Sequence, residues 1–112
     1  MGTDNGYSMI VTTCPDKDAA KVIAKLLVDQ RLAACVQMLP IESVYIWRED
    51  VCDENEIMLF IKSKAELFGR ISNAIRENHS YEVPEIIQLP ITGGLPEYLK
   101  WIEDNTLSGE SM

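Results

Sequence analysis

The densest group of chemically useful side chains in this sequence lies in the seven residues 79–85, which read H-S-Y-E-V-P-E. This segment holds the chain's one imidazole, together with a phenol and two carboxylates. Imidazole suits copper and zinc, whereas carboxylate alone suits harder ions. His79 and Glu85 are therefore the candidate metal ligands. An alternative role for His79 is structural, because a cation is favoured at the C-terminal end of a helix.

The common signatures of catalysis are missing from the sequence. A single histidine excludes a multi-histidine metal site within one chain. The sequence contains no G-x-x-x-x-G-K-[ST] or G-x-G-x-x-G phosphate-binding pattern, and no nucleophile elbow. Cys14, Cys35 and Cys52 have no C-x-x-C spacing and are expected to be reduced thiols. We therefore expect no catalytic residues and predict that the protein is not an enzyme.

The element that must position the candidate residues is a long hairpin predicted over residues 45–63. Two runs with alternating apolar side chains flank a charged tip, residues 48–50, which is typical of antiparallel strands. A small domain covers only one face of such a sheet with its own helices, so a further copy of the chain is expected to cover the other. The second strand is apolar on both faces, with Ile57, Leu59 and Ile61 on one and Met58 and Phe60 on the other.

The rest of the chain predicts an α+β fold of the ferredoxin-like βαββαβ type with an additional C-terminal helix. Both crossover helices are expected on one face of the sheet. Residues 1–112 form one domain, in which 1–6 and 107–112 are expected to be frayed tails. The predicted elements are a strand over 7–13, a helix over 16–31, a strand from Leu32 that bends at Pro40 and resumes at Ser43, the hairpin, a helix over 64–78, a strand over 85–91 and a helix from Pro96.

The composition of the chain indicates which classes of partner it can bind. The net charge is −8, and only 10 of 112 residues are Lys or Arg. This balance disfavours nucleic acid, because neutralising phosphates needs a basic patch. No apolar run reaches the about 18 residues that a membrane span needs. The first six residues lack the basic and apolar regions of a signal peptide, so a cytoplasmic protein is expected.

Five spaced motifs run along nearly the whole chain. They are Leu32-Ala33-Ala34-Cys35-Val36, Ser43-Val44-Tyr45-Ile46-Trp47, Glu56 with Ile61-Lys62-Ser63, His79-x-Tyr81-x-x-Pro84-Glu85-Ile86 and Tyr98-Leu99-x-Trp101-Ile102. In this combination they resemble the CutA divalent-cation tolerance proteins. The resemblance implies a ferredoxin-like fold, a stable homotrimer in the bacterial cytoplasm and a link to tolerance of copper and other divalent cations, with no metal tightly bound.

Three positions depart from the pattern of that family. Ser80 replaces a proline that usually follows the histidine. Glu49 replaces a glycine at the hairpin tip, so a different turn geometry is expected there. Some members carry a proposed copper-binding cysteine at the end of the first strand, where this chain has Thr12. Cys14 lies two residues further along, on the same face if the strand continues, and is the candidate thiol ligand.

Two hypotheses of function follow. The first is a trimeric protein that binds copper or another divalent cation near the subunit interface, at His79 and Glu85. The second is a trimeric signalling or interaction scaffold, similar in architecture to the PII proteins, with a small ligand or protein partner in clefts between subunits. A pairing of Glu85 with Lys62 across the sheet would make both residues architectural. The cleft candidates are Tyr45, Trp47, Glu56, Lys62 and Tyr81.

Overall fold

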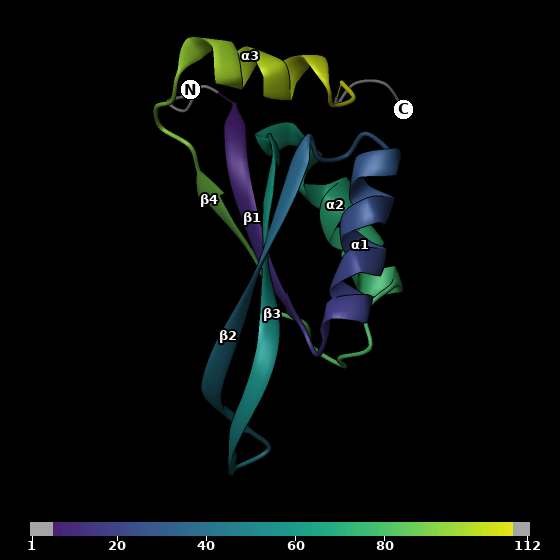
Figure 1. Cartoon of the computed structure of the whole chain (residues 1–112), viewed down its shortest axis with the longest axis vertical. Coiled ribbons are helices and arrows are strands. Elements are labelled where there is room, and N and C mark those ends of the chain that lie inside the picture. The colour runs from purple at the N-terminus through teal and green to yellow at the C-terminus, as the bar shows by residue number, and fades with distance from the viewer. Residues whose placement is uncertain (1–5, 109–112) are drawn as a thin grey trace.

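The computed structural model describes residues 6–108, which form a four-stranded antiparallel sheet and three α-helices (Figure 1). The strands lie in the order β2-β3-β1-β4, which is the order of a ferredoxin-like sheet. The predicted fold class is therefore confirmed. The elements are β1 (Tyr7–Cys14), α1 (Lys17–Asp29), β2 (Cys35–Trp47), β3 (Asp50–Lys64), a short 3-10 helix (Ala65–Leu67), α2 (Phe68–Glu77), β4 (Ile86–Pro90) and α3 (Pro96–Asp104).

The core lies between the sheet and the two helices α1 and α2, which share one face of the sheet as predicted (Figure 1). Helix α1 directs its apolar side chains, which recur at helical spacing, toward the sheet, and β1 and β3 direct every second side chain toward the helices. Both sets of side chains therefore meet in one core layer. Helix α3 lies across the end of the sheet. Fully buried side chains in the core include Ile10, Leu27, Leu59, Ile61, Ile71 and Ile75.

Helix α1 begins at a side-chain cap. Asp16 has an extended backbone, and its Oδ1 accepts a hydrogen bond of 2.8 Å from the Ala19 N–H, one of the donors that a helix start leaves unpaired. Asp16→Ala is expected to lower the free energy of unfolding by about 1 kcal/mol, measured by denaturant unfolding. Asp16→Asn keeps the accepting oxygen and serves as the control. An equal loss in both variants would contradict the capping role.

The chain after α1 differs from the prediction, because β2 begins at Cys35 and not at Leu32. Arg31 has a φ of +60°, and the N–H groups of Leu32 and Ala33 both donate to the Leu27 carbonyl, at 2.9 and 3.2 Å. These bonds close the end of the helix. They also hold Leu32 and Ala33 in the core before the chain enters the sheet.

Strands β2 and β3 form one continuous hairpin. Their register runs without a skipped residue along all 13 residues of β2, and Pro40 lies opposite Ile57. The predicted interruption at Pro40 is therefore wrong. The reason is that β2 is an edge strand, where proline's missing N–H removes no bond that the sheet needs.

The hairpin turns through two residues, Arg48 and Glu49, with φ values of 52° and 75°. Positive φ at both central residues is the mark of a type I′ turn, whose twist matches that of the strands. Such turns favour Asn and Gly, because other side chains are strained in this conformation. The tip is therefore a strained turn that keeps the two strands in register.

Much apolar surface is left open by the described chain. The distal half of the hairpin extends beyond α1 and α2 (Figure 1), and its side chains Val44, Ile46 and Val51 are 70%, 74% and 73% exposed. On the sheet face opposite α1 and α2, Leu39 and Ile87 are also exposed. The chain's own helices leave this surface without cover.

Two residues expected in frayed tails are held in place. The Ala65 N–H donates to the Gly6 carbonyl at 2.7 Å, and the Leu107 N–H donates to the Arg31 carbonyl at 2.9 Å. Leu107 also packs against the core. The fraying prediction is wrong for these two residues, while residues 1–5 and 109–112 lie outside the described part. No helix within residues 6–108 has the length and apolar character to cross a membrane.

Candidate functional site

His79 lies just after α2, half-buried against the end of β1. Its Nε2 lies 2.6 Å from the Thr13 carbonyl, and its Nδ1 lies 3.1 Å from the Tyr81 amide nitrogen. Because the Tyr81 N–H is a donor, Nδ1 must accept, and Nε2 carries the proton that is donated to Thr13. The imidazole therefore ties the segment 79–85 to the sheet.

The predicted helix-capping role of His79 is wrong. Helix α2 ends at Glu77, and the next residue, Asn78, donates its side-chain Nδ2–H to the Ala74 carbonyl at 2.8 Å. Asn78 thus occupies the cap position itself. The chain then leaves the helix axis and directs His79 toward β1.

Cys14 is the thiol nearest to this imidazole, with its Sγ 3.9 Å from His79 Nε2. The side chain is fully buried, and burial raises the pKa of the thiol to about 11, with the nearby charges of Asp16 and Glu56 adding to the shift. The thiol is therefore protonated at neutral pH. Thr12 shares the buried face of β1 with Cys14, as the strand alternation predicts.

Glu85, the second predicted metal ligand, is exposed just before β4. It is one of the residues that line a groove beside the segment 79–85. Within residues 6–108, no group of three or more His, Cys, Asp or Glu side chains is placed to hold one metal ion. The nitrogen and sulfur of His79 and Cys14 are thus a donor pair. Any complete ligand set needs groups from outside this described chain.

A groove of about 910 Å³ lies between the segment 79–85 and the hairpin. Side chains from β1, β2, β3 and the segment 79–85 line this groove. It exists only in the folded chain, because β1, the hairpin and the segment 79–85 are far apart in the sequence. Four of the five cleft residues predicted from the sequence line it, namely Tyr45, Trp47, Glu56 and Tyr81.

Two tyrosine–glutamate pairs organise this region. The Tyr81 hydroxyl donates to Glu56 at 2.7 Å, and the Tyr45 hydroxyl donates to Glu54 at 2.6 Å. Glu56 is only 7% exposed, so the phenol supplies the partner that a buried carboxylate requires. Burial and this bond raise the pKa of Tyr81, and the bond to Glu54 raises the pKa of Tyr45. Both phenols therefore remain protonated donors.

The rim of the groove joins the hairpin tip to the segment 79–85. Arg48 donates from Nη2 to Glu82 at 2.6 Å, and its guanidinium lies 5.2 Å from the centre of the Trp47 ring. The pairing of Arg48 with Glu82 was not predicted from the sequence, because the two residues lie 34 positions apart and no local pattern connects them. The Tyr45–Glu54 pair was also missed, although a diagonal pair follows from the hairpin register once the turn is known.

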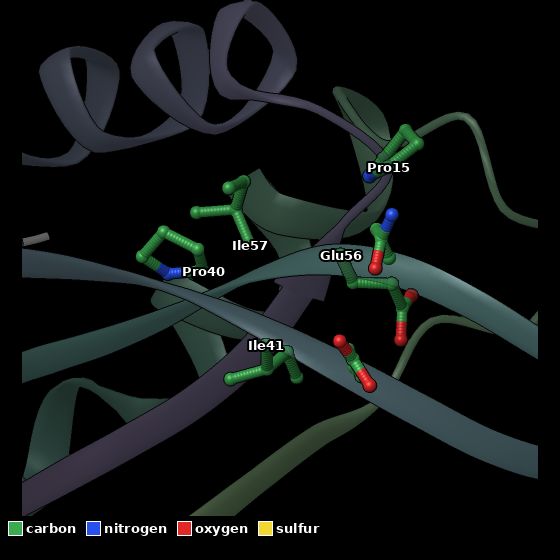
Figure 2. A pocket seen from close by; sticks show the side chains of 7 residues that line it. Pro15, Pro40, Ile41, Glu56 and Ile57 are labelled. Carbon is green, nitrogen blue, oxygen red and sulfur yellow. The ribbon is translucent and has the colours of Figure 1, made fainter.

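A smaller pocket of about 300 Å³ adjoins the same region (Figure 2). Pro15, Pro40 and Ile57 give it an apolar lining. Ile41 and Glu56 border both this pocket and the large groove. The buried carboxylate of Glu56 is therefore common to two hollows, and the Tyr81 hydroxyl fixes it in that place.

Lys62 is the predicted cleft residue that the chain does not bring to the groove. It lies six residues along β3 from Glu56, and its Nζ is 5.7 Å from the centre of the Tyr98 ring on α3. The predicted pairing of Lys62 with Glu85 is also wrong. Strand β1 lies between β3 and β4 in the sheet, which separates the two residues.

Comparison with known proteins places the chain among cation-tolerance proteins. Residues 8–105 match the family described as the CutA1 divalent ion tolerance protein. The chain is 41% identical over 99 residues to the chloroplastic protein CutA of Arabidopsis thaliana, covering 88% of this chain but only 54% of that relative. It is 39% identical over 99 residues to the divalent-cation tolerance protein CutA of Thermus thermophilus, covering 88% of this chain and 96% of that protein.

Solved structures of similar proteins agree in fold. CutA1 from a psychrotrophic Shewanella superposes with a TM-score of 0.89 at 42% identity, covering 94% of this chain and 99% of that chain. The Archaeoglobus fulgidus CutA, described as a periplasmic divalent cation tolerance protein, gives a TM-score of 0.87 at 34% identity, covering 88% and 97%. The family and two of these relatives, those of Thermus thermophilus and Archaeoglobus fulgidus, are named for tolerance of divalent cations. This chain belongs to the CutA divalent-ion tolerance family.

Proposed function

We propose that this protein supports tolerance of divalent cations by binding copper, or another divalent ion that accepts nitrogen and sulfur ligands. His79 and Cys14 are the proposed donors, and Glu85 contributes negative charge from the same segment as His79. The observation that carries this proposal is the distance of 3.9 Å between Cys14 Sγ and His79 Nε2. Imidazole and thiolate are the ligands that select copper and zinc over harder ions.

The separation of the two donors fits one ion. Metal–nitrogen and metal–sulfur bonds of about 2.0 and 2.3 Å at a tetrahedral angle place the two ligand atoms about 3.5 Å apart. Small side-chain movements from 3.9 Å are sufficient. An ion bound by Nε2 would replace the Thr13 carbonyl as its partner, and the imidazole proton would move from Nε2 to Nδ1, which could then no longer accept from the Tyr81 N–H. The Cys14 thiol would release its proton to the solvent.

The remaining ligands are proposed to come from water or from neighbouring copies in a homotrimer. The exposed apolar side chains of the distal hairpin and of the open sheet face support such an assembly, because their burial between copies is the simplest way to remove them from water. Light scattering after gel filtration tests it, and a monomer at micromolar concentration would exclude it. We propose that this assembly acts in the cytoplasm and catalyses no reaction.

Copper binding in competition with a chelator tests the donor pair. His79→Ala and Cys14→Ser are each expected to weaken binding by more than about 100-fold, since even outer-shell losses at metal sites cost 10- to 100-fold. The pKa of Cys14 lies near 11, so each bound ion releases a thiol proton. Affinity should therefore rise by about tenfold per pH unit between pH 7 and 9.

Cys52→Ser is the matched control, because it removes a thiol that lies on the hairpin rather than beside His79. This variant should bind copper as tightly as the parent protein. Copper affinity that is unchanged by His79→Ala would leave the imidazole as a structural tie between Thr13 and Tyr81 and would overturn the proposed site.

A second candidate function is a ligand-binding or interaction scaffold with the PII-like architecture. The large groove favours it, because one continuous hollow holds the aromatic rings of Tyr45, Trp47 and Tyr81 and the buried carboxylate of Glu56. Binding sites commonly combine apolar walls with a few fixed polar groups. This function needs no metal, and Cys14→Ser, which removes the proposed copper thiol, changes no residue that lines the groove.

A further inference from the structure

We propose that the large groove binds a linear organic polycation, a di- or triamine such as a polyamine. This inference rests on the second candidate function and gives the chemical class of its ligand. The two proposed copper donors, His79 and Cys14, do not line the groove, whereas Glu85 belongs to both proposals.

The charges that line the groove are strongly unbalanced. The described residues that line the groove include four carboxylates, one guanidinium and no lysine. That guanidinium, Arg48, already pairs with Glu82. A cleft with one sign of charge concentrates ligands of the opposite sign, and the net charge of −8 for the whole chain adds to this field. The carboxylates are those of Glu42, Glu56, Glu82 and Glu85.

The spread of these carboxylates favours a long cation over a metal ion. They come from β2, β3 and the segment 79–85, and no three acidic, histidine or cysteine side chains of residues 6–108 are placed around one ion. A volume of about 910 Å³ also exceeds what a single hydrated ion fills. A chain of two or three ammonium groups separated by methylenes reaches several carboxylates at once.

The walls of the groove suit the methylene segments of such a ligand. Tyr45, Trp47 and Tyr81 are among its lining residues, and Met58 and Val83 add apolar surface. Aromatic faces attract ammonium groups as well as covering methylenes, so they serve both parts of a polyamine. The hydroxyls of Tyr45 and Tyr81 are engaged with glutamates, which leaves the rings held in place before a ligand arrives.

Calorimetric titration of the assembled protein with spermidine tests this inference. We expect saturable binding with one site per chain. Glu56→Gln and Glu82→Gln should each weaken it by about tenfold or more, the usual effect of removing a charged hydrogen-bond partner. Glu56→Gln keeps an oxygen that can accept from Tyr81, so the fold is retained. Glu97→Gln, which makes the same charge change on α3, should leave the affinity within about twofold.

Three results would overturn the proposal. Equal weakening by Glu97→Gln would mean diffuse attraction to an acidic protein, as would displacement of spermidine by an equal concentration of Mg²⁺. No binding to the assembled protein would mean that another copy of the chain covers the groove. Copper binding by Glu82→Gln should stay at the level of the parent protein, because Glu82 is not among the charges that act on Cys14. A loss of copper binding in Cys14→Ser that leaves spermidine binding intact would separate the two functions, because Cys14 does not line the groove.

Discussion

Replacing Leu59 by alanine is expected to lower the free energy of unfolding by about 2–5 kcal/mol, as found for other fully buried leucines. Leu59 is 0% exposed at the centre of β3, opposite Thr12 on β1 and Met38 on β2. Truncation leaves a cavity under α1 and α2, and a sheet with neighbours on both sides of β3 has little freedom to collapse into it. Denaturant unfolding at one fixed protein concentration measures this loss.

The control for this variant is Val22→Ala on the outer face of α1, where the side chain is 59% exposed. A surface change of this kind should alter the free energy of unfolding by less than about 0.5 kcal/mol. A loss for Leu59→Ala as small as that of the control would mean that the core is not closed over the middle of β3.

Trp47→Ala is expected to cost about 3–5 kcal/mol per chain, the range for large aromatic truncations at buried positions. Within one chain Trp47 is 38% exposed at the end of β2, and Arg48 lies over its ring. The full cost therefore arises only if neighbouring copies in the proposed homotrimer cover the exposed part of the indole. Unfolding and light scattering at several protein concentrations measure stability and assembly together.

Trp47→Phe keeps a large ring and should retain most of the stability and the same oligomeric state. A loss below about 1 kcal/mol for Trp47→Ala, with unchanged assembly, would show that the indole stays in water. That result would remove Trp47 from the interface but would not affect the copper donors.

The parts of the fold that the sequence predicted are those with a regular period. The alternation of Ile57, Leu59 and Ile61 placed their side chains on the buried face of β3, and the structure buries all three. Turn and edge effects were harder to predict. Arg31 has a positive φ after α1, although glycine or asparagine is the usual residue in that conformation. Pro40 is accommodated in the edge strand without a bend.

The candidate site depended on distances that no local pattern records. His79 and Cys14 lie 65 residues apart in sequence and meet because the segment after α2 returns to the end of β1. Lys62 and Glu85 were expected to meet, but the position of β1 between their strands separates them. Residue chemistry selected the candidate groups, whereas strand order decided which of them are neighbours.

Strand β1 lies between β3 and β4 in the sheet, and this position affects the order in which the strands can pair during synthesis on the ribosome. Strand β1 emerges first, yet its two partners are residues 57–64 of β3 and residues 86–90 of β4. By contrast, β2 and β3 are joined by a two-residue turn and can pair as soon as both have emerged. Non-local pairings form slowly, because loop closure must precede their stabilising contacts. Strand β1 can therefore be enclosed on both sides only after β4 has emerged, and until then its apolar residues are open to misassembly.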